Sequence, residues 1–282
     1  MSTKIEAPAV AKGQEEAAIE RQAAERPDEG GGRLTIFLAR LLFIALPILA
    51  WEILSVQLDA HYFVSQPSDI WGRLVEWTLD GTTLRHLLFT LQETVFGFFA
   101  GAGAGILVGL VLGLVPFLAR ALDPVIVGLY SLPKVALAPL FIVWFGIGMT
   151  MKVALSAISV FFLVLFNTLS GVRDVDRELI DVIRLMKGNR WQILTEVVLP
   201  SALVWVFSGL RISVPYAMIG AVTGEIITSN RGLGYLVSRS AGELDTTGVF
   251  AALAILVAVS LVLHEIVVRV ESRVLHWRNA GR

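Results

Sequence analysis

Residues 87–113 read LLFTLQETVFGFFAGAGAGILVGLVLG, and Glu93 is the one charged side chain in this run. A helix of that length rises about 40 Å, at about 1.5 Å per residue. The hydrocarbon core of a bilayer is about 30 Å thick, so the run is long enough and apolar enough to cross it. It therefore predicts a membrane-spanning helix over 87–113.

Glycine recurs at every fourth position within this run. Small residues at that spacing form a strip along one side of a helix and let a neighbouring backbone approach closely. Two partners for the strip are open: another helix of the same chain, which is the favoured interpretation, or a second copy of the chain. The strip consists of Gly97, Gly101, Gly105, Gly109 and Gly113.

Five further apolar runs of similar length lie at residues 34–56, 124–146, 152–171, 201–227 and 247–269. Of the 282 residues, 55% are hydrophobic and 17% are charged, and the mean hydropathy is +0.72. A soluble domain has about 25% charged residues, and a disordered chain is more polar still. The expected fold class is all-α, a polytopic membrane protein with six transmembrane helices.

The loops differ in positive charge, and this difference orients the helices. With the amino terminus inside, fifteen of the 23 Lys and Arg residues fall in inside segments and five in outside segments. This bias follows the positive-inside rule and places both termini in the cytoplasm. Residues 1–33 are rich in Glu, Ala, Arg and Gly without apolar periodicity, which predicts a disordered cytoplasmic tail.

The sequence offers little for catalysis or metal binding. It contains no cysteine, and its four histidines lie in separate segments, so neither a metal site nor a catalytic residue is predicted. The formal charge of -1 and the lack of a basic stretch exclude a nucleic-acid partner. No P-loop pattern occurs, so any energy-driven activity depends on a partner protein or an ion gradient. An integral membrane enzyme is a third, disfavoured class.

Among the charged side chains within the predicted spans, four are candidates for lining a polar pathway. Such groups are expensive in a bilayer and commonly face a cavity or a partner. Pro133 and Pro139 flank Lys134 and predict a broken helix, and a helix beginning at Pro124 would place Lys134 near mid-bilayer. Static ion pairs that fix helix packing are an equal alternative to a polar pathway. The candidates for a translocation pathway are Lys134, Arg211, Glu225 and Glu93.

The segment between the fourth and fifth runs, residues 172–200, is polar and amphipathic. One apolar stripe is predicted at helical spacing from Leu179, Val182, Ile183 and Met186. Asp176 can cap this helix, and Gly188 with Asn189 can end it. Asn189 and Gln192 then predict a capping box for a second short helix. This cytoplasmic helix-turn-helix would either lie on lipid headgroups or offer a knob to a partner, and its exposed turn favours the knob.

This segment resembles the EAA coupling loop of inner-membrane permeases from ATP-binding-cassette importers. The family pattern is Glu-Ala-Ala, three residues, Gly, nine residues and Ile-x-Leu-Pro. Counting back from Leu199-Pro200 puts Asp181-Val182-Ile183 at Glu-Ala-Ala and Lys187 at the glycine. The glycine of this chain comes one residue later, so we expect Gly188-Asn189 to supply the left-handed residue of the turn. The resemblance implies coupling to an ATPase through Asp181, Val182, Ile183, Lys187, Gly188, Asn189, Leu199 and Pro200.

Further matches, spread over roughly residues 34–278, resemble the sulfonate, nitrate and taurine permease group. They are Ala138-Pro139-Leu140, Trp144-Phe145-Gly146-Ile147-Gly148, Asn167-Thr168-Leu169-Ser170-Gly171, Gly209-Leu210-Arg211, and Glu225 followed by Gly232-Leu233-Gly234. The resemblance implies a transmembrane permease domain over 34–282 in the bacterial inner membrane. It also implies import of a small anionic solute, such as a sulfonate, taurine or nitrate.

The same resemblance implies an assembly. Two copies of the permease would form a homodimer within membrane lipid, and two ATPase subunits would bind the coupling loops and hold ATP and Mg. A periplasmic or extracellular solute-binding protein would deliver the cargo, and the chain itself would hold no cofactor. Replacing Asp181 or adding bulk at Gly188 would then abolish transport without loss of expression. The alternative function is an ion-gradient-coupled secondary transporter that uses Glu93 or Glu225 as a proton or sodium site.

Overall fold

The computed structural model describes residues 33–57 and 64–276, and these ranges contain helices and no strand. They fall into two units that divide between residues 60 and 61. The first unit contributes helix α2 (Arg33–Gln57), so the predicted first span at 34–56 is helical. Its crossing of a membrane stays a prediction. The predicted tail at residues 1–33 lies outside the described residues, except for Arg33.

Four helices of the second unit are long and apolar enough to cross a membrane. They are α4 (Thr82–Leu114), α7 (Met149–Arg173), α10 (Leu199–Thr228) with the short helical segments before it, and α12 (Thr246–Val274). These helices match four of the predicted runs. The described residues thus support four spans, or five if the bent pair described next counts as one, and six remains an expectation.

The predicted run at 124–146 is not one straight helix. Helix α5 (Pro116–Ser131) is followed by a 3₁₀ turn, η1 (Lys134–Leu137), and by α6 (Ala138–Phe145), and the two halves are bent by 89°. Pro133, which lacks an N–H, sits at the break as predicted. However, α5 begins eight residues before Pro124, and the chain turns immediately before Lys134. The placement of Lys134 along a straight helix from Pro124 was therefore wrong.

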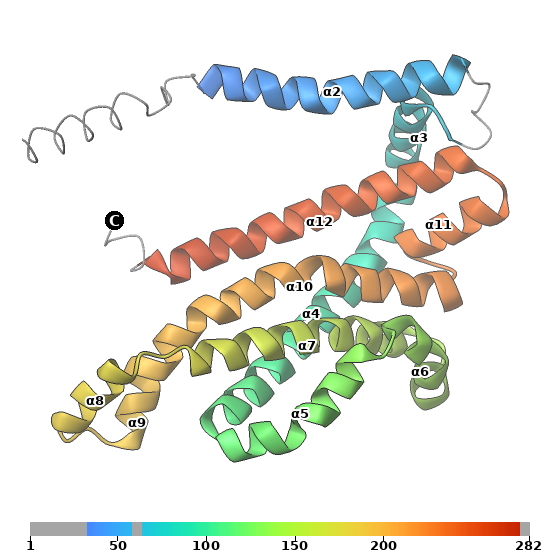
Figure 1. Ribbon diagram of the computed structural model, residues 1–282. Coiled ribbons are helices and arrows are strands. Elements are labelled where there is room, and N and C mark those ends of the chain that lie inside the picture. Colours follow the sequence, from blue (N-terminus) through green and yellow to red (C-terminus); the bar gives the residue numbers. More distant parts are fainter. Residues whose placement is uncertain (1–32, 58–63, 277–282) are drawn as a thin grey trace, which may run out of the picture. The chain divides into compact units, whose positions relative to one another are not determined.

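The glycine strip of α4 packs against α7 (Figure 1). A Cβ added at Gly105 would lie 2.7 Å from the Phe161 carbonyl oxygen, and one at Gly113 would lie 2.5 Å from the Val172 Cβ. A Cβ at Gly101 would strike the α7 backbone as well. Helix α10 also approaches α7 closely, at Gly220. The favoured interpretation, packing within one chain, is confirmed, because the strip is already covered by α7.

The two ends of this unit carry different short helices (Figure 1). Helices α8 (Arg177–Leu185) and α9 (Arg190–Gln192) lie at the end where α7 finishes and α10 begins. Helices α3 (Pro67–Leu79) and α11 (Leu233–Gly242) lie at the opposite end. There an ion pair joins Arg73 of α3 to Asp245, which caps α12 by accepting from the Gly248 N–H.

Candidate functional site

The helix-turn-helix at residues 176–192 has the caps that its sequence predicts. The Asp176 carboxylate accepts from the Glu178 N–H at 2.9 Å and caps α8. At α9, the Asn189 side chain accepts from the Gln192 N–H at 2.9 Å, and the Gln192 side chain accepts from the Asn189 N–H at 2.8 Å. This reciprocal pair is a capping box, which satisfies two otherwise unpaired donors.

The turn between these helices differs from its prediction at one residue. Lys187, rather than Gly188 or Asn189, has the left-handed conformation, with φ of 60°. The Gly188 N–H donates to the Ile183 carbonyl and the Lys187 N–H to the Arg184 carbonyl. These two bonds make a Schellman motif, in which glycine usually occupies the position that Lys187 holds. The family pattern places its glycine at that same position.

Gly188 is needed for a different reason, which is close approach. A Cβ at this position would lie 2.9 Å from the Ile183 carbonyl oxygen and would strike the Ile183 side chain. Ile183 itself packs, together with Ile180, onto a buried cluster at the root of the loop. The cluster consists of Val172, Val175, Val197, Val198 and Ala202. Gly188 thus allows the turn to fold tightly against a helix that is anchored to the membrane domain.

The outer side of α8 is apolar and exposed. The predicted stripe was partly wrong: Ile183 packs inward, whereas Leu179 and Val182 remain 50% and 51% exposed. Leu185 and Met186 are 84% and 76% exposed. We call the following exposed set the α8 apolar face: Leu179, Val182, Leu185 and Met186, together with Trp191 of α9. Asp181 lies beside it in an exposed pair with Arg184, at 3.1 Å.

A continuous helix runs from α9, just after the turn that ends α8, into the long helix α10. A π-helical turn, η2 (Ile193–Val198), joins α9 to α10, and the Leu199 N–H donates to the Leu194 carbonyl. Pro200, which has no N–H to donate, lies in the first turn of α10. The whole run Arg190–Thr228 has 39 residues. At about 1.5 Å per residue it reaches about 58 Å, roughly twice the bilayer core.

Two of the four intramembrane candidates are engaged in ion pairs. Glu93 of α4 accepts from the Lys152 ammonium at 2.7 Å, and both side chains are buried. Arg211 of α10 pairs with Glu271 of α12 at 3.4 Å. Lys152 was missed as a candidate by sequence reasoning, although it is a charged residue at the start of the apolar run 152–171. These contacts fit the alternative of static ion pairs that fix helix packing, and a role in translocation stays a proposal.

Glu225, the third candidate, fastens α11 to two long helices. Three successive N–H groups, of residues 232–234, donate to the His86 Nδ1, the Thr90 hydroxyl and the Glu225 carboxylate, at 3.0, 2.8 and 2.7 Å. The Thr90 hydroxyl in turn donates to the other Glu225 oxygen at 2.7 Å. Glu225 is fully buried. The first turn of α11 is therefore held by side chains from α4 and α10.

Lys134, the fourth candidate, lies at the 89° bend. Its ammonium donates to the Tyr130 carbonyl and lies 4.4 Å from the centre of the Tyr130 ring. It forms no ion pair with any residue in the ranges 33–57 and 64–276. The four candidates therefore contact different partners and do not form one site. Glu93 and Glu225 are on α4 and α10, which pack against each other.

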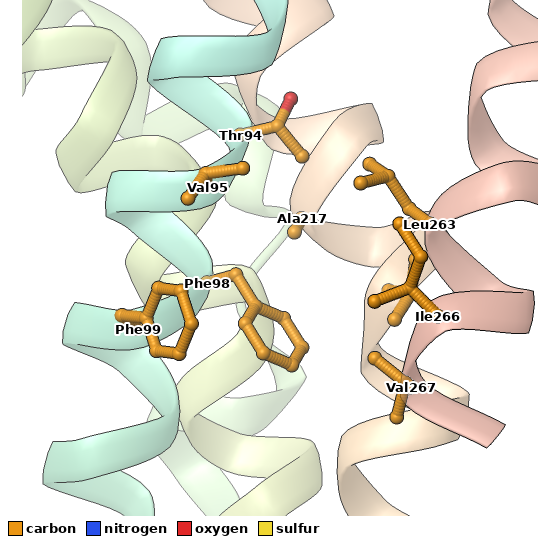
Figure 2. Close-up of a pocket in the computed structure, with 9 residues that line it drawn as sticks. Thr94, Val95, Phe98, Phe99, Ala217, Leu263, Ile266 and Val267 are labelled. Carbon is orange, nitrogen blue, oxygen red and sulfur yellow. The ribbon is translucent and has the colours of Figure 1, made fainter. Parts of the chain in front are cut away.

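A cavity of about 260 Å³ lies between α4, α10 and α12. Figure 2 shows Leu263, Ile266 and Val267 of α12 across from Phe98 and Ala217. Its lining is almost entirely apolar, and none of the four charged candidates contributes to it. The cavity therefore has no group that would select an ion. In the part of the chain that the structure describes, no cluster of three His, Cys, Asp or Glu residues could hold a metal ion.

Comparison with known proteins places this geometry among transport proteins. The family described as "Binding-protein-dependent transport system inner membrane component" matches residues 101–276. The putative aliphatic sulfonates transport permease protein SsuC of Bacillus subtilis is 32% identical over 241 residues, 85% of this chain and 87% of that protein. The riboflavin transport system permease protein RibX of Chloroflexus aurantiacus is 35% identical over 236 residues, 83% of this chain and 88% of that protein.

A solved structure supports the fold. A chain of the MetNI methionine ABC transporter, in an inward-facing conformation, is similar with a TM-score of 0.60 and 20% identity. The similarity covers 66% of this chain and 93% of that one. At that identity the similarity concerns the arrangement of the helices alone.

Proposed function

We propose a function from one premise: the chain belongs to the family of binding-protein-dependent transport system inner membrane components. Members of this family are permease subunits of transporters and are not enzymes. We infer that this chain is one permease subunit of an ATP-driven importer. A separate partner subunit would bind Mg and hydrolyse ATP, and α8 would receive the resulting motion.

The observation that carries this proposal is the α8 apolar face. Burial of apolar surface is favourable by about 25 cal/mol for each Å² removed from water. Contiguous exposed apolar patches therefore commonly mark interaction sites. Leu185 and Met186 are among the most exposed large apolar side chains of the second unit. The opposite side of the same helix is anchored by Ile180 and Ile183. A partner that covers the exposed side would therefore act on a firmly attached element.

The proposed assembly follows the family resemblance. It comprises a second copy of the permease, two ATPase subunits and an external solute-binding protein, in a bacterial inner membrane and without nucleic acid. Charge bias supports an orientation with six spans, α8 and both termini in the cytoplasm, and α11 outside. The cargo is proposed to be a small anionic solute of the sulfonate, taurine or nitrate class.

The mechanism that we propose is transmission along one helix. When the ATPase subunits close, they would displace α8 and α9. Because α9, η2 and α10 form a continuous helix, the displacement would reach Arg211, near the middle of α10, and its ion pair with Glu271 of α12. Rigid-body movement of this kind changes which side a pathway faces. It requires that ATP and the loaded binding protein each favour one of the two states.

The four charged candidates, Lys134, Arg211, Glu225 and Glu93, stay proposals for the translocation pathway. Lys134 is the best supported, because it lies at a helix break and makes no ion pair among the described residues. The other three are engaged in contacts between helices. They would contribute to a pathway only if those contacts break during the transport cycle.

Uptake in proteoliposomes that contain the permease, its ATPase and its binding protein tests this function. We expect uptake that requires ATP and persists when an ionophore collapses the proton and sodium gradients. Uptake that stops with the gradients while ATP is maintained would instead favour the alternative, an ion-coupled carrier. The buried Glu93 and Glu225 are the observation in favour of that alternative.

Gly188→Val is expected to abolish uptake without loss of expression, because the added side chain meets Ile183 and opens the turn. Lys187→Gly is the matched control in the same turn. It removes a left-handed lysine, which costs about 1 kcal/mol relative to glycine, so uptake should be kept. The measurement is ATP-driven uptake at equal amounts of protein. Normal uptake by Gly188→Val would contradict a rigid connection through this turn.

A further inference from the structure

We propose that a cavity between the start of α4 and α11 binds a small organic oxyanion. The cavity has a volume of about 560 Å³. Helix α11, which borders it, lies at the end of the second unit opposite α8 (Figure 1). Three arginines line the cavity, Arg85, Arg231 and Arg239, together with His86 and two aromatic rings. Cavities of this size are typical of sites for small ligands.

The charges around the cavity leave a net positive centre. Arg239 is already paired with Glu243 at 2.9 Å. Hydrogen bonds from Thr82 and, to a smaller extent, the charge of Arg85 lower the pKa of Asp80, so Asp80 is ionised and offsets part of the Arg85 charge. Arg231 has no ion-pair partner in the described ranges 33–57 and 64–276. It is therefore the cation that a ligand would neutralise.

The Arg231 guanidinium is held in position for such a ligand. It lies 5.2 Å from the centre of the Phe89 ring, within the range of a cation–π interaction. Arg231 is exposed, so the N–H groups of its guanidinium are accessible to a ligand. The planar guanidinium matches two oxygens of a carboxylate, phosphate or sulfonate. Because Phe89 is on α4 and Arg231 precedes α11, the contact also joins the two walls of the cavity.

His86 also lines the cavity. Its Nδ1 accepts from the Gly232 N–H at 3.0 Å. The ring stacks on Tyr235, with centroids 5.7 Å apart and 18° between the planes. Phe89 and Tyr235 thus provide an apolar wall beside the cations. This combination fits an organic oxyanion better than a bare inorganic ion.

The N–H groups at the start of α11 are not part of this site. Those of residues 232–234 are already taken by His86, Thr90 and Glu225. Binding therefore relies on the arginine side chains rather than on a helix terminus. Identifying the ligand as the imported solute rests on the proposed function, whereas binding itself does not.

Binding of ethanesulfonate to the full chain in phosphatidylcholine nanodiscs tests the site, measured by isothermal titration calorimetry without ATP. We expect Arg231→Gln to weaken binding about tenfold or more, as loss of a hydrogen bond to a charged group does. Arg269→Gln is the matched control, since it removes an exposed arginine that pairs within α12. Its affinity should equal that of the wild type. Equal affinity of Arg231→Gln and the wild type would overturn the proposal.

Two further arms identify the source of the oxyanion. The titration is repeated in phosphatidylglycerol nanodiscs, where unchanged affinity supports a solute site. Loss of ethanesulfonate binding there would assign the cavity to a lipid phosphate and overturn the proposal. Failure of ethanesulfonate to bind, with weaker binding of the solute-binding protein to Arg231→Gln, would overturn it in favour of a protein contact. A chain that binds ethanesulfonate but shows no ATP-driven uptake would refute the proposed function and leave the site standing.

Discussion

Val182→Glu is expected to abolish ATP-driven uptake by preventing the ATPase from binding to α8. Val182 lies within the α8 apolar face and is half-exposed in the isolated chain, so the variant should fold normally. In the complex, the new carboxylate would be buried without a partner. An unpaired buried charge costs about 3 kcal/mol or more, which corresponds to a loss of affinity of at least about 100-fold. The measurement is the dissociation constant of the purified ATPase.

Leu244→Glu provides the matched control for this substitution. Leu244 is an apolar residue that is 87% exposed, and it lies at the end of the second unit that carries α11. It should leave the affinity for the ATPase unchanged. If Val182→Glu and the wild type bind the ATPase equally well, the α8 apolar face is not the contact surface.

Gly105→Val is expected to lower the free energy of unfolding strongly. At this position α4 approaches the α7 backbone so closely that a Cβ would lie 2.7 Å from the Phe161 carbonyl oxygen and 3.0 Å from the Val164 Cβ. The backbone of a helix within a packed core cannot move aside locally. Overpacking of this kind costs on the order of 3 kcal/mol, a large fraction of a typical stability of about 5–15 kcal/mol. Thermal unfolding in detergent, followed by size-exclusion chromatography, measures the loss.

Gly103→Val is the matched control. It lies two residues away and makes the same change of helix propensity without a contact to α7. No heavy atom lies within 4 Å of a Cβ added there. This variant should unfold within a few degrees of the wild type. Equal stability of the two variants would mean that α4 and α7 do not pack through the glycine strip. It would favour the other interpretation, in which the strip contacts a second copy of the chain.

Features that depend on local spacing could be predicted from the sequence. The apolar runs located the long helices, and the four-residue repeat of glycine indicated one tightly packed side of α4. The cap by Asp176 and the capping box at Asn189 were also predictable, because each depends on residues two or three positions apart. The partner of the strip needed the structure, since spacing describes one helix and says nothing of its neighbour.

Features that depend on contacts between residues far apart in the sequence could not be predicted as well. The ion pair of Glu93 with Lys152 joins residues of two helices that are 59 positions apart in the sequence, and nothing in either segment specifies the other. The cavity around Arg231 likewise combines α4 with the start of α11. The left-handed residue was misassigned for a subtler reason. A Schellman motif is counted from the last turn of the helix, and the sequence alone suggested the glycine rather than Lys187.

Contact between α8 and the ATPase can be measured directly by placing a photo-crosslinking amino acid at Val182, or at Leu244, in a reconstituted complex that imports solute. The account predicts a covalent adduct with the ATPase subunit from position 182 and none from position 244. An importing preparation in which position 182 yields no adduct with a nucleotide-hydrolysing subunit would contradict it.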